Sequence, residues 1–134
     1  MSVFPHDQLP VTEVPRIRTR ILCGPGQGAA QTAIWQQWLA AGSFIPLHYH
    51  EVEEVLLVTA GTLEVTLGEE MSLVTAPASI VVAAGQLHAM RPPSGATAEL
   101  IAVFPTASPT ILDADGNPRP MPWEDLDTRE PVEE

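Results

Sequence analysis

Hydrophobic side chains make up 45% of the 134 residues, which is enough for the core of one domain and too many for a largely disordered chain. The formal net charge of −11 argues against nucleic acid or an anionic membrane surface as a partner, because both repel acidic proteins. Cys23 is the only cysteine, so no internal disulfide bond is possible. With no signal peptide at the N-terminus and no apolar stretch long enough to span a membrane, we expect a cytoplasmic protein.

The first 15 residues carry three prolines, which favour an extended N-terminal arm over a helix. The alternating sequence of residues 16–21 then predicts a strand with Arg16, Arg18 and Arg20 on one face. We place the start of the main domain here and expect it to cover residues 16–112.

Short β-branched runs separated by glycine or proline predict an all-β domain with antiparallel pairing. The expected strands lie near residues 31–40, 43–50, 54–60, 62–67, 71–75, 79–83, 87–91 and 97–104. The remaining residues, 113–134, are rich in proline and contain eight acidic side chains, so we expect an acidic C-terminal tail.

Three of the four histidines fall in two glycine-marked segments, which makes them the main functional signal in the chain. His48 and His50 are two residues apart, and a strand places such residues on the same face. Glu54 follows four residues after His50, and we interpret Glu51 and Glu53 as a solvated bend. With His88, these side chains suit one divalent transition metal ion: Fe, Mn, Ni, Co, Cu or Zn.

The spacing of these residues resembles the cupin superfamily. The family's first motif is matched at every fixed position, by Gly42, His48, His50, Glu54 and Gly61. The second motif is degenerate: Gly85 and His88 match, whereas the positions expected to hold glycine, proline and asparagine hold Pro77, Ala83 and Pro92. The resemblance covers about residues 31–104.

The resemblance implies a single jelly-roll β-barrel, often a homodimer, that holds one metal through three histidines and one glutamate. It does not fix the reaction, since cupins include dioxygenases, decarboxylases, isomerases, lyases and proteins without catalytic activity. We expect a metal-dependent enzyme of the dioxygenase type, an oxidoreductase, acting on a small organic substrate. The alternatives are a non-redox lyase, isomerase or decarboxylase, and a cupin that binds a small ligand without turnover.

Strand parity predicts which side chains line the cavity beside the metal. Phe44 shares a face with His48 and His50, while Gln86 and Met90 flank His88. We expect these three residues to contact the substrate. Leu56 and Val58 follow Glu54 on its face, and we expect them to belong to the core.

Overall fold

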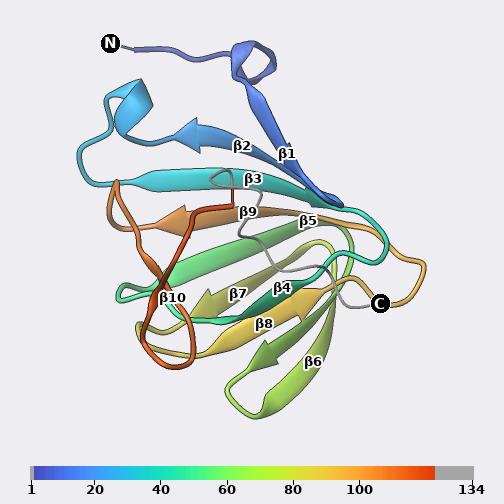
Figure 1. Ribbon diagram of the computed structural model, residues 1–134. Coiled ribbons are helices and arrows are strands. Elements are labelled where there is room, and N and C mark those ends of the chain that lie inside the picture. The colour runs from blue at the N-terminus through green and yellow to red at the C-terminus, as the bar shows by residue number, and fades with distance from the viewer. Residues whose placement is uncertain (1, 123–134) are drawn as a thin grey trace.

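The computed structural model describes residues 2–122 and consists of β-strands joined by turns and two short 3-10 helices, His6–Gln8 and Pro25–Gln27 (Figure 1). The strands are β1 (Val11–Val14), β2 (Ile17–Cys23), β3 (Ala33–Leu39), β4 (Ile45–His48), β5 (Glu54–Leu67), β6 (Glu70–Thr75), β7 (Ala78–Val82), β8 (His88–Arg91), β9 (Ala98–Phe104), β10 (Ile111–Leu112) and β11 (Pro118–Arg119). Residues 123–134, the larger part of the expected acidic tail, lie outside the described residues.

The strands form two layers that share β5 (Figure 1). One layer has the order β1-β2-β3-β9-β5-β7, and the other has the order β4-β8-β5-β6. Every strand pair is antiparallel. The predicted all-β jelly-roll fold is therefore confirmed.

The strands predicted at residues 54–60 and 62–67 are one long strand, β5, rather than two. Gly61 has a φ of +77°, and a Cβ atom there would lie 2.1 Å from the carbonyl oxygen of Thr97. The glycine bends the strand without reversing its direction. The pairing register between β5 and β9 shifts nearby, between Val58 and Ala60. Consequently β5 pairs with β7 and β9 before the bend and with β6 and β8 after it.

The core lies between the two layers and follows the expected period of two. Alternate residues of β3 and β9 are buried, and the same alternation continues along β5. Leu56 and Val58 are 0% and 1% exposed, so their predicted place in the core is correct. The first residue of β5, Glu54, faces the same interior.

Both ends of the described chain join the β-structure. Part of the expected N-terminal arm forms β1, whose pairing with β2 places the boundary at residue 15 inside a hairpin. Arg16 turns this hairpin with a φ of +66°. Near the other end, β10 and β11 form a short hairpin, and Leu112 forms an isolated bridge with Tyr49. This second hairpin lies next to the segment that carries His48 and His50.

Candidate metal centre

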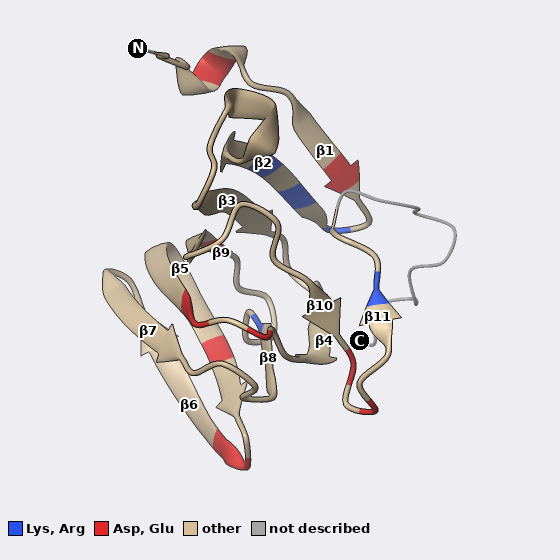
Figure 2. Ribbon diagram, turned by 90° about the vertical axis from the view of Figure 1, so that its left-hand side faces the viewer, with Lys and Arg blue, Asp and Glu red and all other residues tan. Residues whose placement is uncertain are grey.

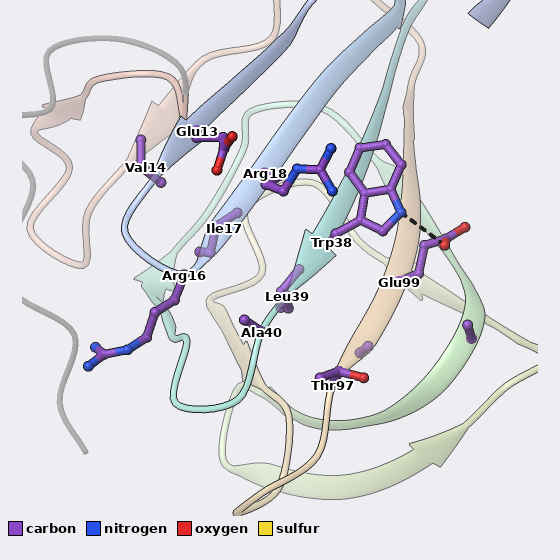
Figure 3. Close-up of a pocket in the computed structure, with 12 residues that line it drawn as sticks. Glu13, Val14, Arg16, Ile17, Arg18, Trp38, Leu39, Ala40, Thr97 and Glu99 are labelled. Atoms are coloured by element: carbon purple, nitrogen blue, oxygen red, sulfur yellow. Dashed lines mark hydrogen bonds between the residues drawn. The ribbon is translucent and has the colours of Figure 1, made fainter. Parts of the chain in front are cut away.

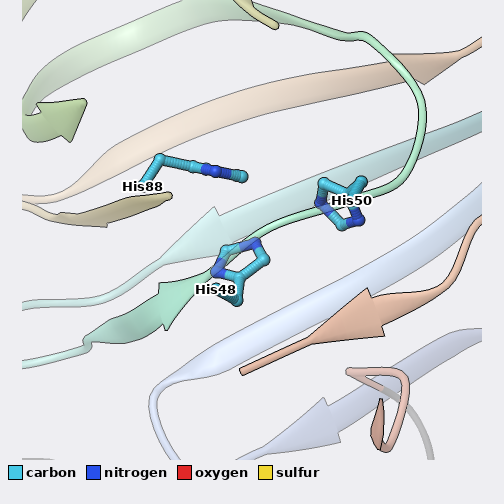
Figure 4. A group of neighbouring side chains, drawn as sticks. All are labelled: His48, His50 and His88. Carbon is cyan, nitrogen blue, oxygen red and sulfur yellow. The ribbon is translucent and has the colours of Figure 1, made fainter. Parts of the chain in front are cut away.

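Strands β4, β5 and β8, with the turn after β4, bring the predicted ligands together in the interior, and Figure 4 shows the three histidines among them. His48 ends β4 and pairs directly with His88, the first residue of β8. His50 lies two residues beyond His48, and Glu54 begins β5. All four side chains are buried, with exposed fractions between 0% and 6%.

The three histidines offer nitrogen atoms that all lie within 4.8 Å of one another. Their ring centroids are 4.1 Å apart for His48 and His88, 5.0 Å for His48 and His50, and 5.4 Å for His50 and His88. Metal–nitrogen bonds of about 2 Å allow two nitrogens on opposite sides of one ion to be up to about 4 Å apart. The limit of 4.8 Å is close to this value, so the three histidines are grouped as the ligands of one ion would be.

Hydrogen bonds to backbone carbonyls fix the protonation of each ring at Nδ1. The Nδ1 atom of His48 lies 2.7 Å from the carbonyl oxygen of Pro46, and that of His88 lies 3.0 Å from the carbonyl oxygen of Gln86. His50 makes the same bond, at 2.7 Å, to the carbonyl oxygen of Thr110. A carbonyl oxygen only accepts, so each Nδ1 carries the proton. In the neutral ring, Nε2 is then a bare lone pair, which is the form that binds a metal.

Glu54 completes a set of donors that needs a cation. Its Oε1 atom lies 3.1 Å from Nε2 of His88 and 3.3 Å from Nε2 of His50. With neutral rings, these contacts bring lone pairs against a carboxylate, and such an arrangement is stable only if protons or a metal ion lie between them. Imidazole nitrogen and carboxylate oxygen are ligands of divalent transition metals, so the chemistry of the donor set fits one.

Burial and mutual proximity shift the ionisation of the cluster. Burial, followed by the charge of His88, lowers the pKa of His48 from 6.5 to about 3. Burial alone would raise the pKa of Glu54, but hydrogen bonds from His50 and His88, when these are protonated, and their charges outweigh it and lower that pKa to about 2. His48 is thus neutral and Glu54 ionised at neutral pH, as metal binding requires.

The neighbouring carboxylates lie outside the cluster, as their interpretation as a solvated bend predicts. Glu51 and Glu53 are exposed, and an oxygen of Glu51 accepts a hydrogen bond from the hydroxyl of Thr110. In the described residues, Glu54 is the only acidic side chain among the buried ones.

The three predicted substrate contacts differ in their surroundings. Met90 is 4% exposed and lies two residues from His88 on the same side of β8. Phe44 is partly buried just before β4. The side chain of Gln86 is partly buried, and its amide oxygen accepts a hydrogen bond from the backbone N–H of Ala83 at 3.1 Å, closing the turn before β8.

Two neighbours of the cluster were not anticipated from the sequence. The ring of Phe104 packs edge-on against His50, with centroids 4.9 Å apart. The carbonyl of Thr110 holds His50 from a segment 60 residues away. The strand pattern contained a signal for Phe104, which shares the inward face of β9, but a backbone carbonyl leaves no signal in the residue types.

The matches to known proteins agree with this fold. A cupin-domain family model matches residues 36–104, just over half of the chain, and the protein therefore belongs to the cupin family. No curated protein matches it in sequence.

Solved structures share the fold at low sequence identity. The polyketide cyclase RemF from Streptomyces resistomycificus has a TM-score of 0.75 at 18% identity over 85% of each chain. KdgF from Halomonas sp. has a TM-score of 0.66 at 19% identity over 78% of this chain and 94% of its own. The oxalate decarboxylase of Lactobacillus farciminis has a TM-score of 0.69 at 19% identity over 78% of this chain but 32% of its own.

A groove away from the histidines lies along β1, β2, β3 and β9, with a volume of about 420 Å³ (Figure 3). Trp38 lines it and donates its indole N–H to Glu99 at 3.0 Å, while Arg18 stacks over the indole ring at 5.0 Å.

Among the described residues, no helix has the length and apolar character needed to cross a membrane.

Proposed function

We propose that this cupin is a mononuclear metal-dependent enzyme acting on a small organic substrate, with one divalent transition metal held by His48, His50, His88 and Glu54. One observation carries the proposal: three clustered histidines each carry the Nδ1 proton toward a backbone carbonyl, and the Nε2 atoms of His50 and His88 lie beside the buried carboxylate of Glu54. A metal bound by these residues supplies Lewis acidity toward a substrate oxygen and, if redox-active, reactivity toward dioxygen.

The chain's own side chains would orient the substrate and keep the site dry. The carboxylate of Glu54 offsets part of the metal's charge in the interior. The ring of Phe104 and the side chain of Met90 contribute apolar surface that excludes water. Phe44, Gln86 and Met90 remain the residues that we propose to contact the substrate.

Oxygen chemistry of the dioxygenase type is the first candidate reaction. The buried polar side chains of residues 2–122 are those of Thr19, Gln37, Ser43, His48, His50, Glu54 and His88. If Glu54 and the histidines bind the metal, this set supplies no further carboxylate, lysine or imidazole as a general base. Hydrolysis or proton abstraction normally needs such a base, so its absence from this set favours a reaction that does not depend on one.

A non-redox lyase, isomerase, decarboxylase or cyclase is the second candidate. It is supported by fold similarity to two proteins whose names state such reactions, a polyketide cyclase and an oxalate decarboxylase. Oxygen uptake separates the two candidates, because only the first consumes dioxygen. A cupin that binds a ligand without turnover would show neither uptake nor product.

Metal analysis of four proteins tests the proposed ligands. The wild type should contain close to one Fe, Mn, Ni, Co, Cu or Zn per chain, and His48→Ala and Glu54→Gln should lose most of it, because each loses one ligand. Glu53→Gln is the matched control, because it changes an exposed carboxylate one residue from Glu54 and should keep the metal.

Circular dichroism should show all four proteins folded. Full metal retention in Glu54→Gln would remove Glu54 from the ligand set, and loss in Glu53→Gln would identify the wrong carboxylate. A wild type that takes up none of these metals, even when they are added, would contradict the proposal. The metal found then directs the assays, beginning with oxygen uptake in the presence of small organic acids and phenols.

A further inference from the structure

The residues that follow the barrel return to the metal centre. After β9 ends at Phe104, the chain runs back past β4 and forms the β10–β11 hairpin (Figure 2). We call residues 109–122 the C-terminal strap. It lies outside residues 36–104, to which the cupin family model corresponds.

The strap contacts three consecutive residues of the segment that carries the ligands. The N–H of Tyr49 donates to the carbonyl of Leu112 at 2.8 Å, and the N–H of Leu112 donates to the carbonyl of Tyr49 at 3.0 Å. Nδ1 of His50 donates to the carbonyl of Thr110 at 2.7 Å. The hydroxyl of Thr110 donates to Glu51 at 3.2 Å. The strap is therefore hydrogen-bonded to the chain on both sides of His50.

The strap is itself held in place by its turn and by the core. An oxygen of Asp113 accepts hydrogen bonds from the N–H groups of Asp115 and Asn117, both at 2.9 Å. Ile111 and Met121 pack against the hydrophobic core. The carbonyl of Thr110 thus has a fixed position, and it can orient a ring.

The three ligand histidines differ in what holds them. The Nδ1 partners of His48 and His88 are carbonyls two residues earlier in the same segment, so those rings are oriented locally. The partner of His50 lies 60 residues away in the strap. His50 is thus the one histidine of the three whose orientation depends on a distant part of the chain.

We propose that the C-terminal strap is a positioning element of the metal centre, which holds His50 with Nε2 toward the metal through the carbonyl of Thr110. This inference rests on the proposed metal site. Loss of a partner that orients a ligand typically lowers metal affinity 10- to 100-fold. Loosening the strap should have an effect of that size.

Two full-length variants loosen the strap without changing any metal ligand. Leu112→Pro removes the N–H that bonds to Tyr49. Gly116→Val places a branched side chain at a φ of +84°, with its Cβ 3.4 Å from the hydroxyl oxygen of Tyr49. The matched control is Gly68→Val in the turn between β5 and β6. There φ is +61° and no other atom lies within 4 Å of an added Cβ.

The measurements are the Kd for Co(II), by competition with a chromophoric chelator, and the visible spectrum of the bound Co(II), which reports ligand geometry. Both strap variants should raise the Kd about 10- to 100-fold and alter the spectrum. Gly68→Val should retain the wild-type Kd and spectrum, even if its Tm falls as far as the Tm of the strap variants. General destabilisation would not produce this difference.

Folded strap variants with the wild-type Kd and spectrum would overturn the positioning role while leaving the metal site in place. If Leu112→Pro does not fold, Gly116→Val alone decides the question. A wild type that binds no Co(II) overturns the proposed function, and the role of the strap with it.

Discussion

Burying three imidazoles and a carboxylate at one point costs free energy, because each group loses its hydration. The carbonyls at the three Nδ1 atoms recover part of that cost, while the Nε2 atoms of His50 and His88 face Oε1 of Glu54. Burial also disfavours the charged form of a histidine, so the stability of the metal-free protein should depend on pH.

His48 gives this sensitivity a definite sign. The unfolded chain protonates His48 below a pKa near 6.5, whereas burial and the charge of His88 lower the folded pKa to about 3. Between these values the unfolded state binds more protons, so stability falls as the pH falls. One such group contributes a slope of up to about 1.4 kcal/mol per pH unit. The lowered pKa of Glu54, about 2, adds a loss of the same sign below about pH 4.5.

Urea unfolding of chelator-treated protein at several pH values from 6.5 to 4.5 measures how His48 contributes to the free energy of unfolding. Glu54 does not interfere in this range, because its own contribution changes only below about pH 4.5. In His48→Asn the amide can still donate to the carbonyl of Pro46 but does not titrate. We expect the free energy of unfolding to fall less steeply with decreasing pH in this variant. Equal slopes in the two proteins would show that His48 does not resist protonation in the fold.

At the scale of elements, Gly61 determines how β5 serves both layers. Alanine at this position would require a positive φ, which costs about 1–2 kcal/mol for a residue with a Cβ atom. It would also place that Cβ 2.1 Å from the carbonyl oxygen of Thr97, so the backbone must move. We expect Gly61→Ala to lower the free energy of unfolding by more than about 2 kcal/mol.

Gly68→Ala is the control for this prediction, because it has a φ of +61° with no atom within 4 Å of the added Cβ. Urea unfolding should show a loss of only about 1–2 kcal/mol for this variant. A Gly61→Ala protein as stable as Gly68→Ala would mean that the bend in β5 adapts without cost.

The strands were predictable from the sequence where a local pattern determined them. Glycine and proline separated most of the strands before any pairing was known, and the spacing of the cupin motif selected the buried carboxylate, Glu54, from three. The continuity of β5 was not predictable, because Gly61 reads equally well as a turn or as a bend. That choice depends on Thr97, which is distant in sequence.

The return of the strap to His50 was also hidden in the sequence. It rests on a backbone carbonyl, at Thr110, and every residue type provides one. Pro105 directly follows β9, the last strand of the main sheet. Where the chain goes next depends on pairing between Leu112 and Tyr49, which has no pattern in residue type.

At the scale of the whole molecule, the outward side of the layer containing β3, β9, β5 and β7 has an unusual composition. One row across these strands consists of Ile34, Val103, Val55 and Val81. The next row has Ile101 and Leu57 at its centre and Gln36 and Ser79 at its ends. Val81 is 59% exposed and the other apolar residues of the two rows are partly exposed, so the middle of this outer face is an apolar surface. Exposed apolar patches usually mark interfaces.

The edge of the outer face carries charges of both signs. Arg18 and Arg20 lie on β2, whose ribbon is blue at the basic residues in Figure 2, and both stack over Trp38. Glu99 accepts the indole N–H of Trp38 on β9. A two-fold axis brings the same patch of two copies together, so arginines of one copy can meet a carboxylate of the other. The expected homodimer therefore has a candidate interface in the outer face.

Leu57→Glu tests this interface by adding a charge to the middle of the outer face. Because desolvating an unpaired carboxylate costs several kcal/mol, we expect a dimeric wild type and a monomeric variant in light scattering coupled to size exclusion. Leu73→Glu is the control, since Leu73 is 65% exposed but lies on β6 in the other layer. A monomeric wild type at high concentration would exclude the homodimer. Dissociation by Leu73→Glu but not by Leu57→Glu would instead place the interface on the layer of β6.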